Sequence, residues 1–186
     1  MAKTQFNIDK YFEQLQERIT NILSRPKSNT FTYDILDTSK SRKNKLIVLR
    51  EKQLQMKIGE IWQEVLGSYR DCINLYNKHP SGLDILCRKR KFIIELKNRT
   101  NTDNASSRRS NLDKLAAFKH KHPEYTCIYV NINADTEEKT MTGFRKPILH
   151  NGVELIHYVG YEFLTFILGD DTQRVIDFVR HVIDSA

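Results

Sequence analysis

The sequence of 186 residues is poor in cysteine and has no long apolar run. Its three cysteines, Cys72, Cys87 and Cys127, are odd in number and show no CxxC spacing. This pattern argues against a disulfide framework and against a cysteine-rich zinc site, so reduced thiols in a cytoplasm are expected. No uncharged apolar run approaches the ~20 residues of a membrane span, and the N-terminal residues lack the apolar core of a signal peptide. These absences together predict a cytoplasmic protein.

Common catalytic and nucleotide-binding signatures are missing as well. The chain contains no GxSxG, no GxxxxGK and no GxGxxG, so acyl hydrolase, P-loop and Rossmann functions lack support. His79 is interpreted as a loop residue, and His120 and His122 as cations that suit the end of a helix. The pair His150-Asn151 lacks the second histidine of an HNH nuclease. Nothing resembles a helix-turn-helix or a zinc finger that could read a DNA sequence.

Positive charge is what the sequence has in excess, with 30 Lys and Arg against 23 Asp and Glu and a net charge of +7. A basic surface favours a polyanionic partner, of which nucleic acid is the commonest, although a solvated basic surface is the competing interpretation. Basic residues concentrate at 40–57 and 88–91, with Arg99, Arg108 and Arg109 beyond, where they could flank a duplex backbone.

Hydrophobic periodicity predicts a mixture of helices and strands. Helices are expected over 7–23, 46–66, 111–121, 161–168 and 172–184. Strands are expected in a hairpin over 84–97 and over 125–132 and 153–158. Three segments give weaker signals: a polar, basic linker or loop at 24–45, an ambiguous stretch at 68–78 and a long polar loop at 133–147. The order predicts an α/β fold with a mixed central sheet flanked by helices.

The most informative feature is Asp84, followed after ten residues by Glu95-Leu96-Lys97. Side chains alternate along a strand, so Glu95 and Lys97 point to one face while Ile94 and Leu96 point to the other. Folding of the 84–97 hairpin brings Asp84 close to Glu95 and Lys97. Two carboxylates and an ammonium at one sheet edge can hold a hard divalent cation and position a water. The competing interpretation is an exposed ion pair worth ~0–1 kcal/mol.

The order of a helix with glutamates, an Asp strand, an ExK strand, a helix and a strand resembles the PD-(D/E)xK nuclease superfamily over residues 50–132. The proline that usually precedes the aspartate is missing, and Gly82-Leu83 stands there. The longer string GLDI…IIELKNRTNTDNASS resembles type II restriction endonucleases. The resemblance implies a restriction-endonuclease-like fold, a single nuclease domain over 1–186 with its core at about 46–132, and hydrolysis of a phosphodiester in double-stranded DNA.

The resemblance also implies a role for each residue of the motif. Asp84 and Glu95 would bind Mg²⁺, for which Mn²⁺ would substitute, with the Leu96 carbonyl as a third ligand. Lys97 would orient the attacking water and offset the charge of the phosphate. Zinc is not expected, because the chain has no cluster of cysteine and histidine.

Residues around the motif are weaker candidates. Glu60 resembles the helix glutamate that contributes to many such sites, Glu64 is an equally spaced rival, and a solvated helix face is the competing interpretation. Asn98, Arg99 and Asn101 could contact phosphates, or they could belong to a polar loop between a strand and a helix.

The whole chain, including its short length, resembles the small subunit of heterodimeric type IIS restriction enzymes. In that case a larger partner subunit would recognise the DNA site and cut one strand, and this chain would cut the other. The linker at 24–45 and the two C-terminal helices would be the first docking surfaces to suspect. The alternatives are a stand-alone homodimeric restriction or repair nuclease and, from another class, a non-catalytic DNA-binding subunit.

Overall fold

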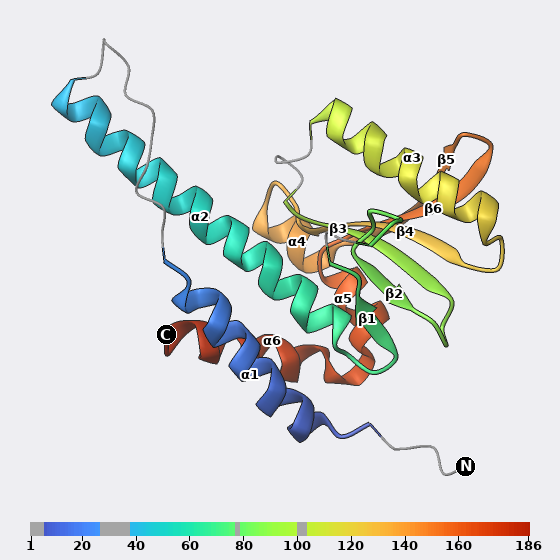
Figure 1. Ribbon diagram of the computed structural model, residues 1–186, viewed down its shortest axis with the longest axis horizontal. Coiled ribbons are helices and arrows are strands. Elements are labelled where there is room, and N and C mark those ends of the chain that lie inside the picture. Colours follow the sequence, from blue (N-terminus) through green and yellow to red (C-terminus); the bar gives the residue numbers. More distant parts are fainter. Residues whose placement is uncertain (1–5, 27–37, 77–78, 100–103) are drawn as a thin grey trace.

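A single mixed sheet of six strands forms the centre of the molecule (Figure 1). The computed structural model describes residues 6–26, 38–76, 79–99 and 104–186, without the side chains of residues 41 and 42. The strand order is β1-β2-β3-β4-β6-β5, in which β3, β4 and β6 run parallel and the other neighbours pair antiparallel. The strands are β1 Cys72–Asn74, β2 Ile85–Cys87, β3 Phe92–Arg99, β4 Thr126–Asn133, β5 Phe144–His150 and β6 Val153–Val159. The predicted α/β class with a mixed central sheet is therefore confirmed.

Helices cover both faces of this sheet (Figure 1). They are α1 Ile8–Ser24, α2 Ser39–Gly67, α3 Ala105–Lys121, α4 Glu137–Thr142, α5 Tyr161–Leu168 and α6 Thr172–Asp184. The larger core lies between the sheet and helices α1, α2, α5 and α6. A smaller core lies between the opposite face and α3, built on Leu83, Ile93, Leu112, Leu115, Cys127, Tyr129 and Leu155. None of the described helices is long and apolar enough to cross a bilayer.

Helix α2 is longer than its apolar pattern predicts. It begins at Ser39, so the predicted linker at 24–45 is wrong for residues 39–45, while residues 27–37 lie outside the described part of the chain. The first turns are rich in Lys, which is a good helix former but gives no amphipathic signal. In Figure 1 the N-terminal half of α2 extends away from the sheet, and it exposes Ile47 and Val48.

The long loop predicted at 133–147 is also wrong, because these residues form α4 and β5. The hydroxyl of Thr136 caps α4 by accepting from the backbone N–H of Lys139. Strand β5 pairs with β6 along its whole length at the edge of the sheet, and most of its side chains are exposed. An edge strand of this kind lacks the apolar alternation by which strands are predicted. Similarly, α3 begins at Ala105, six residues before the predicted start at 111. The side chain of Asn104 caps this helix by accepting from the Ser107 N–H.

The expectation of reduced thiols is wrong for two of the three cysteines. Cys72 in β1 and Cys87 in β2 are register partners and form a disulfide, whereas Cys127 is a buried free thiol whose pKa burial raises to about 11. An odd cysteine count excludes only complete pairing. The strand register that brings Cys72 and Cys87 together was not available from their spacing of 15 residues.

Candidate active site

The hairpin of β2 and β3 brings Asp84 to an uncovered edge of β3. Pairing with β2 ends where Ile85 meets Ile94, so the following residues of β3 have no strand on that side. Asp84 stands at this position, and its carboxylate Oδ2 accepts from the Leu96 N–H at 2.7 Å. The carboxylate thus replaces the missing strand as a partner for the backbone of β3.

Glu95 and Lys97 share the face of β3 that is covered by α3. Lys97 Nζ donates to Glu95 Oε1 at 2.7 Å. The Glu95 side chain is 3% exposed and that of Lys97 is 30% exposed, so the carboxylate lies beneath the ammonium. The second carboxylate oxygen, Glu95 Oε2, is buried without a hydrogen-bond partner. The structure therefore brings Asp84, Glu95 and Lys97 together at one place.

Both carboxyl groups have raised pKa values. Burial is the largest cause for Glu95, followed by the negative charge of Asp84, while Lys97 and Lys114 act in the opposite direction. Burial also raises the pKa of Asp84, against the Leu96 N–H and the same two lysines. Two carboxylates that share a buried site repel each other and resist ionisation. A cation bound between them would relieve both the repulsion and the cost of burial.

The donor atoms at this place fit a hard divalent cation. Glu95 Oε2 has no other partner. The Leu96 N–H points toward Asp84, and in a strand the N–H and C=O of one residue face the same side, so the Leu96 carbonyl faces the same edge. The Asp84 carboxylate, Glu95 Oε2 and the Leu96 carbonyl are all oxygen ligands, which Mg²⁺ prefers. Within the described ranges no group of three or more His, Cys, Asp or Glu side chains is placed to hold a metal, so the third protein ligand would come from the backbone.

Helix α2 reaches the site through Gln63 and not through either predicted glutamate. Gln63 Nε2 donates to Asp84 Oδ1 at 2.9 Å. The Glu60 carboxylate lies on the outer side of the helix and pairs with Arg25. Glu64 is buried, but it binds Asn74 and Arg18, both at 3.1 Å. On this helix the sequence pointed only to the two glutamates, so Gln63, three residues after Glu60, was not predicted.

Helix α3 supplies a second lysine above the site. Lys114 Nζ contacts the Gly82 carbonyl at 3.3 Å and the Asn111 side chain at 3.4 Å. Gly82 has a φ of +61°, a left-handed conformation that glycine adopts without strain, in the turn that leads to Asp84. Lys114 could not be identified from the sequence, because its relation to the motif depends on how α3 packs on the sheet.

Asn98 and His79, two further residues that the sequence brings into question, bind residues other than Asp84, Glu95 and Lys97. Asn98 joins three elements: its amide donates to Gln55 O in α2 at 3.2 Å, and its oxygens accept from Asn133 of β4. Asn101 lies outside the described residues. His79 binds Ser81 in the turn before Asp84, and the structure shows no contact between this histidine and the carboxylates.

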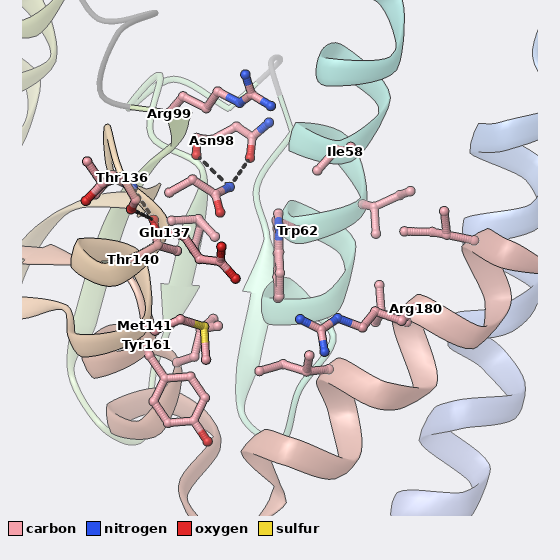
Figure 2. A pocket seen from close by; sticks show the side chains of 18 of the residues that line it. Ile58, Trp62, Asn98, Arg99, Thr136, Glu137, Thr140, Met141, Tyr161 and Arg180 are labelled. Atoms are coloured by element: carbon pink, nitrogen blue, oxygen red, sulfur yellow. Dashed lines mark hydrogen bonds between the residues drawn. The ribbon is translucent and has the colours of Figure 1, made fainter. Parts of the chain in front are cut away.

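A pocket with a volume of about 640 Å³ lies on the other face of the sheet, between α2, α4, α5 and α6 (Figure 2). Trp62 stands in its middle, with Asn98 and Arg99 on one side and Arg180 of α6 on the other. Neither Asp84, Glu95 nor Lys97 lines this pocket. The carboxylate site therefore lies outside this pocket, at the edge of β3 where the pairing with β2 has ended.

Comparison with known proteins identifies the family of the chain. A family model described as Eco47II restriction endonuclease matches residues 2–147, which include the three motif residues and the first four strands. No curated protein and no solved structure matches the chain. The match covers well over half of the sequence and contains the whole carboxylate site. The chain therefore belongs to the Eco47II restriction endonuclease family and is a type II site-specific deoxyribonuclease.

Proposed function

We propose that the chain hydrolyses a DNA phosphodiester in a Mg²⁺-dependent reaction at Asp84, Glu95 and Lys97. One observation carries the proposal: two buried carboxylates with raised pKa values meet a lysine at an open sheet edge. Mutual repulsion of this kind is costly for folding, so the arrangement is better explained by a bound cation than by packing. One such site cuts one strand in each binding event.

Bound Mg²⁺ would act as a Lewis acid on the phosphate and stabilise negative charge. The ion would be held by Asp84, Glu95 Oε2 and the Leu96 carbonyl. Asp84 is fixed from two sides, by Leu96 N–H and by Gln63 Nε2, so its carboxylate is in place before any ligand binds. Such preorganisation avoids reorganisation cost during the reaction.

Lys97 would orient the attacking water. Its ammonium is already hydrogen-bonded to Glu95 Oε1, and its partial exposure leaves it accessible to the substrate. An ammonium has three donors, so Lys97 can keep the bond to Glu95 and still donate to a water and to a phosphate oxygen. The same charge would favour loss of the water proton and offset the charge of the phosphate.

Basic residues on α2 and α3 would hold the duplex over this edge. In Figure 1 the two helices lie on either side of β3. The N-terminal half of α2 carries Lys40, Lys43, Lys45, Arg50 and Lys52, and α3 carries Arg108, Arg109 and Lys114. Contacts of this type supply affinity for the phosphate backbone and little sequence information. Affinity for any duplex should therefore fall steeply as salt is raised.

The role as small subunit of a heterodimeric type IIS enzyme remains a prediction. Cutting both strands needs either sequential rebinding or a second site, which a larger recognition subunit or a second copy of this chain could supply. Purified chain should be tested on plasmid and on strand-labelled duplexes, alone and with a candidate large subunit. Sequence-specific cutting of both strands by the chain alone would reject the heterodimer and favour a homodimeric restriction enzyme.

The chemistry is tested in the same assay with Mg²⁺, with Mn²⁺ and with excess chelator. Cleavage should require one of these two ions and should be lost in Asp84→Asn. The matched control is Asp113→Asn, which neutralises an acid of α3 that pairs with His150 on the surface. Full cleavage in chelator, or by Asp84→Asn, would reject the assignment.

A further inference from the structure

Three buried side-chain polar atoms lack a hydrogen-bond partner in the described part of the chain, and all three belong to residues on one face of the sheet. They are Glu95 Oε2, Asn131 Nδ2 and His157 Nδ1. Their residues are only 2% to 4% exposed and belong to the adjacent parallel strands β3, β4 and β6. Buried polar groups are normally paired, so unpaired atoms on neighbouring strands require an explanation.

Strand register puts the three residues on the face covered by α3. Tyr129 lies between Glu95 on β3 and His157 on β6, and Lys97 lies directly opposite Asn131. Asn131 is therefore beside Lys97 and diagonal to Glu95. On this same face the sheet elsewhere carries apolar residues such as Ile93 and Leu155, so apolar side chains are tolerated there. The polar residues of this face begin at Glu95, which is also the first residue of β3 in the candidate active site.

The hydrogen bond between His157 and Asn131 has a defined direction. His157 Nε2 lies 2.8 Å from Asn131 Oδ1, and because a carbonyl oxygen only accepts, Nε2 carries the proton. Burial, with the charges of Arg108 on α3 and Lys146 on β5, lowers the pKa of His157 to about 4, so the ring is neutral near pH 7. The Nδ2 of Asn131 has no partner of its own, so this amide is still able to donate.

We propose that Asn131 is a positioning residue of the nuclease site: its Nδ2 donates to a buried water, and that water donates to Glu95 Oε2. His157 holds the Asn131 amide in the orientation that this chain of bonds requires. A donor and an acceptor that are both buried and unpaired can be joined by one water. The inference rests on the proposed function, since it assigns these residues to the support of a metal ligand.

The proposal predicts a defect in metal binding that is separate from folding. Asn131→Leu removes the amide at nearly constant volume and should weaken binding of Mn²⁺, measured calorimetrically without DNA, by about 10- to 100-fold. Single-turnover cleavage at fixed Mg²⁺ should fall by a similar factor. Duplex affinity measured in Ca²⁺ should change less than about twofold, because these buried atoms do not touch DNA. His157→Phe should reproduce the defect, and His157→Gln, which keeps a donor, should partly restore it.

The matched control is Thr172→Val at the start of α6, a residue as buried as Asn131 but on the opposite side of the sheet. This variant should bind Mn²⁺ and cut DNA like the wild type at equal folded fraction. If Asn131→Leu does not fold, the double variant Asn131→Leu/His157→Phe replaces both partners by apolar groups, a change that is often neutral for stability.

Wild-type Mn²⁺ affinity and cleavage in folded Asn131→Leu or in the double variant would overturn the proposal. So would an equal loss in Thr172→Val, because the effect would then be one of general packing. If the wild-type chain binds Mn²⁺ but cuts no duplex, either alone or with a candidate large subunit, the proposed function fails while the calorimetric comparison still decides the role of Asn131.

Discussion

The eight residues of β3 alternate between two faces of the sheet, and the two faces differ in chemistry. Toward α1 and α2, Ile94 and Leu96 enter the large apolar core. Toward α3, the strand starts with buried Ile93 and ends with Glu95 and Lys97. Helix α3 packs on this second face, whereas residues of α1, α2, α5 and α6 form the core on the first. The charged side chains of β3 thus lie on the face with the smaller core, near the end of the strand. The larger core on the other face holds the strand in place.

The largest effect is expected when the charge of Glu95, on the face of β3 toward α3, is removed. Glu95→Gln should lower single-turnover cleavage by about 10²- to 10³-fold. At the same time the free energy of unfolding at neutral pH, without metal, should stay constant or rise, because burial and the charge of Asp84 already raise the pKa of Glu95. Urea unfolding and cleavage of strand-labelled duplexes measure the two quantities. Parallel losses of stability and cleavage would show that Glu95 acts through folding.

The opposite result is expected on the apolar face. Ile94→Ala removes a fully buried side chain from the large core and should lower the free energy of unfolding by about 2–5 kcal/mol. Cleavage per folded molecule should remain close to that of the wild type. Leu149→Ala in β5, where the side chain is 79% exposed, is the matched control and should change neither quantity. A loss of cleavage in fully folded Ile94→Ala would contradict the division between the faces.

These differences between the faces bear on what the sequence could reveal. The alternation of Ile93 to Lys97 and the ExK spacing are local, so the hairpin, the strand and the grouping of Asp84 with Glu95 and Lys97 were predictable. Gln63, Lys114 and Asn131 reach the site through helix packing and strand register, which no local pattern encodes. Strand β5 and the first turns of α2 escaped prediction because their side chains are largely exposed and carry no apolar period.

A smaller effect should appear in the pH dependence of stability. The pKa of His157 falls from its usual 6.5 to about 4 in the folded chain, so the unfolded chain binds more protons between these values. The free energy of unfolding contributed by His157 is present above pH 6.5 and is lost as pH falls toward 4. The raised pKa values of Asp84 and Glu95 have the opposite sign, since their cost grows as pH rises from about 4.

The variant His157→Gln isolates the contribution of His157 to the pH dependence of stability. Urea unfolding of the metal-free chain between pH 4 and pH 7 should show that stability rises more steeply with pH in the wild type than in this variant. Identical slopes would mean that His157 titrates normally and is not held neutral by burial beside Arg108 and Lys146.

The smallest effect concerns how α2 supports the polar face. Gln63→Leu removes the donor to Asp84 Oδ1 and should lower cleavage by about tenfold, because Asp84 keeps its second anchor at Leu96 N–H. Glu60→Gln is the matched control on the same helix and should be close to the wild type, since its carboxylate faces Arg25 on the surface. Single-turnover cleavage at several Mg²⁺ concentrations separates the two variants, because loosening of Asp84 should also raise the concentration needed for half-maximal rate. The reverse order, with Glu60→Gln the more defective variant, would mean that α2 turns Glu60 toward the metal when DNA is bound.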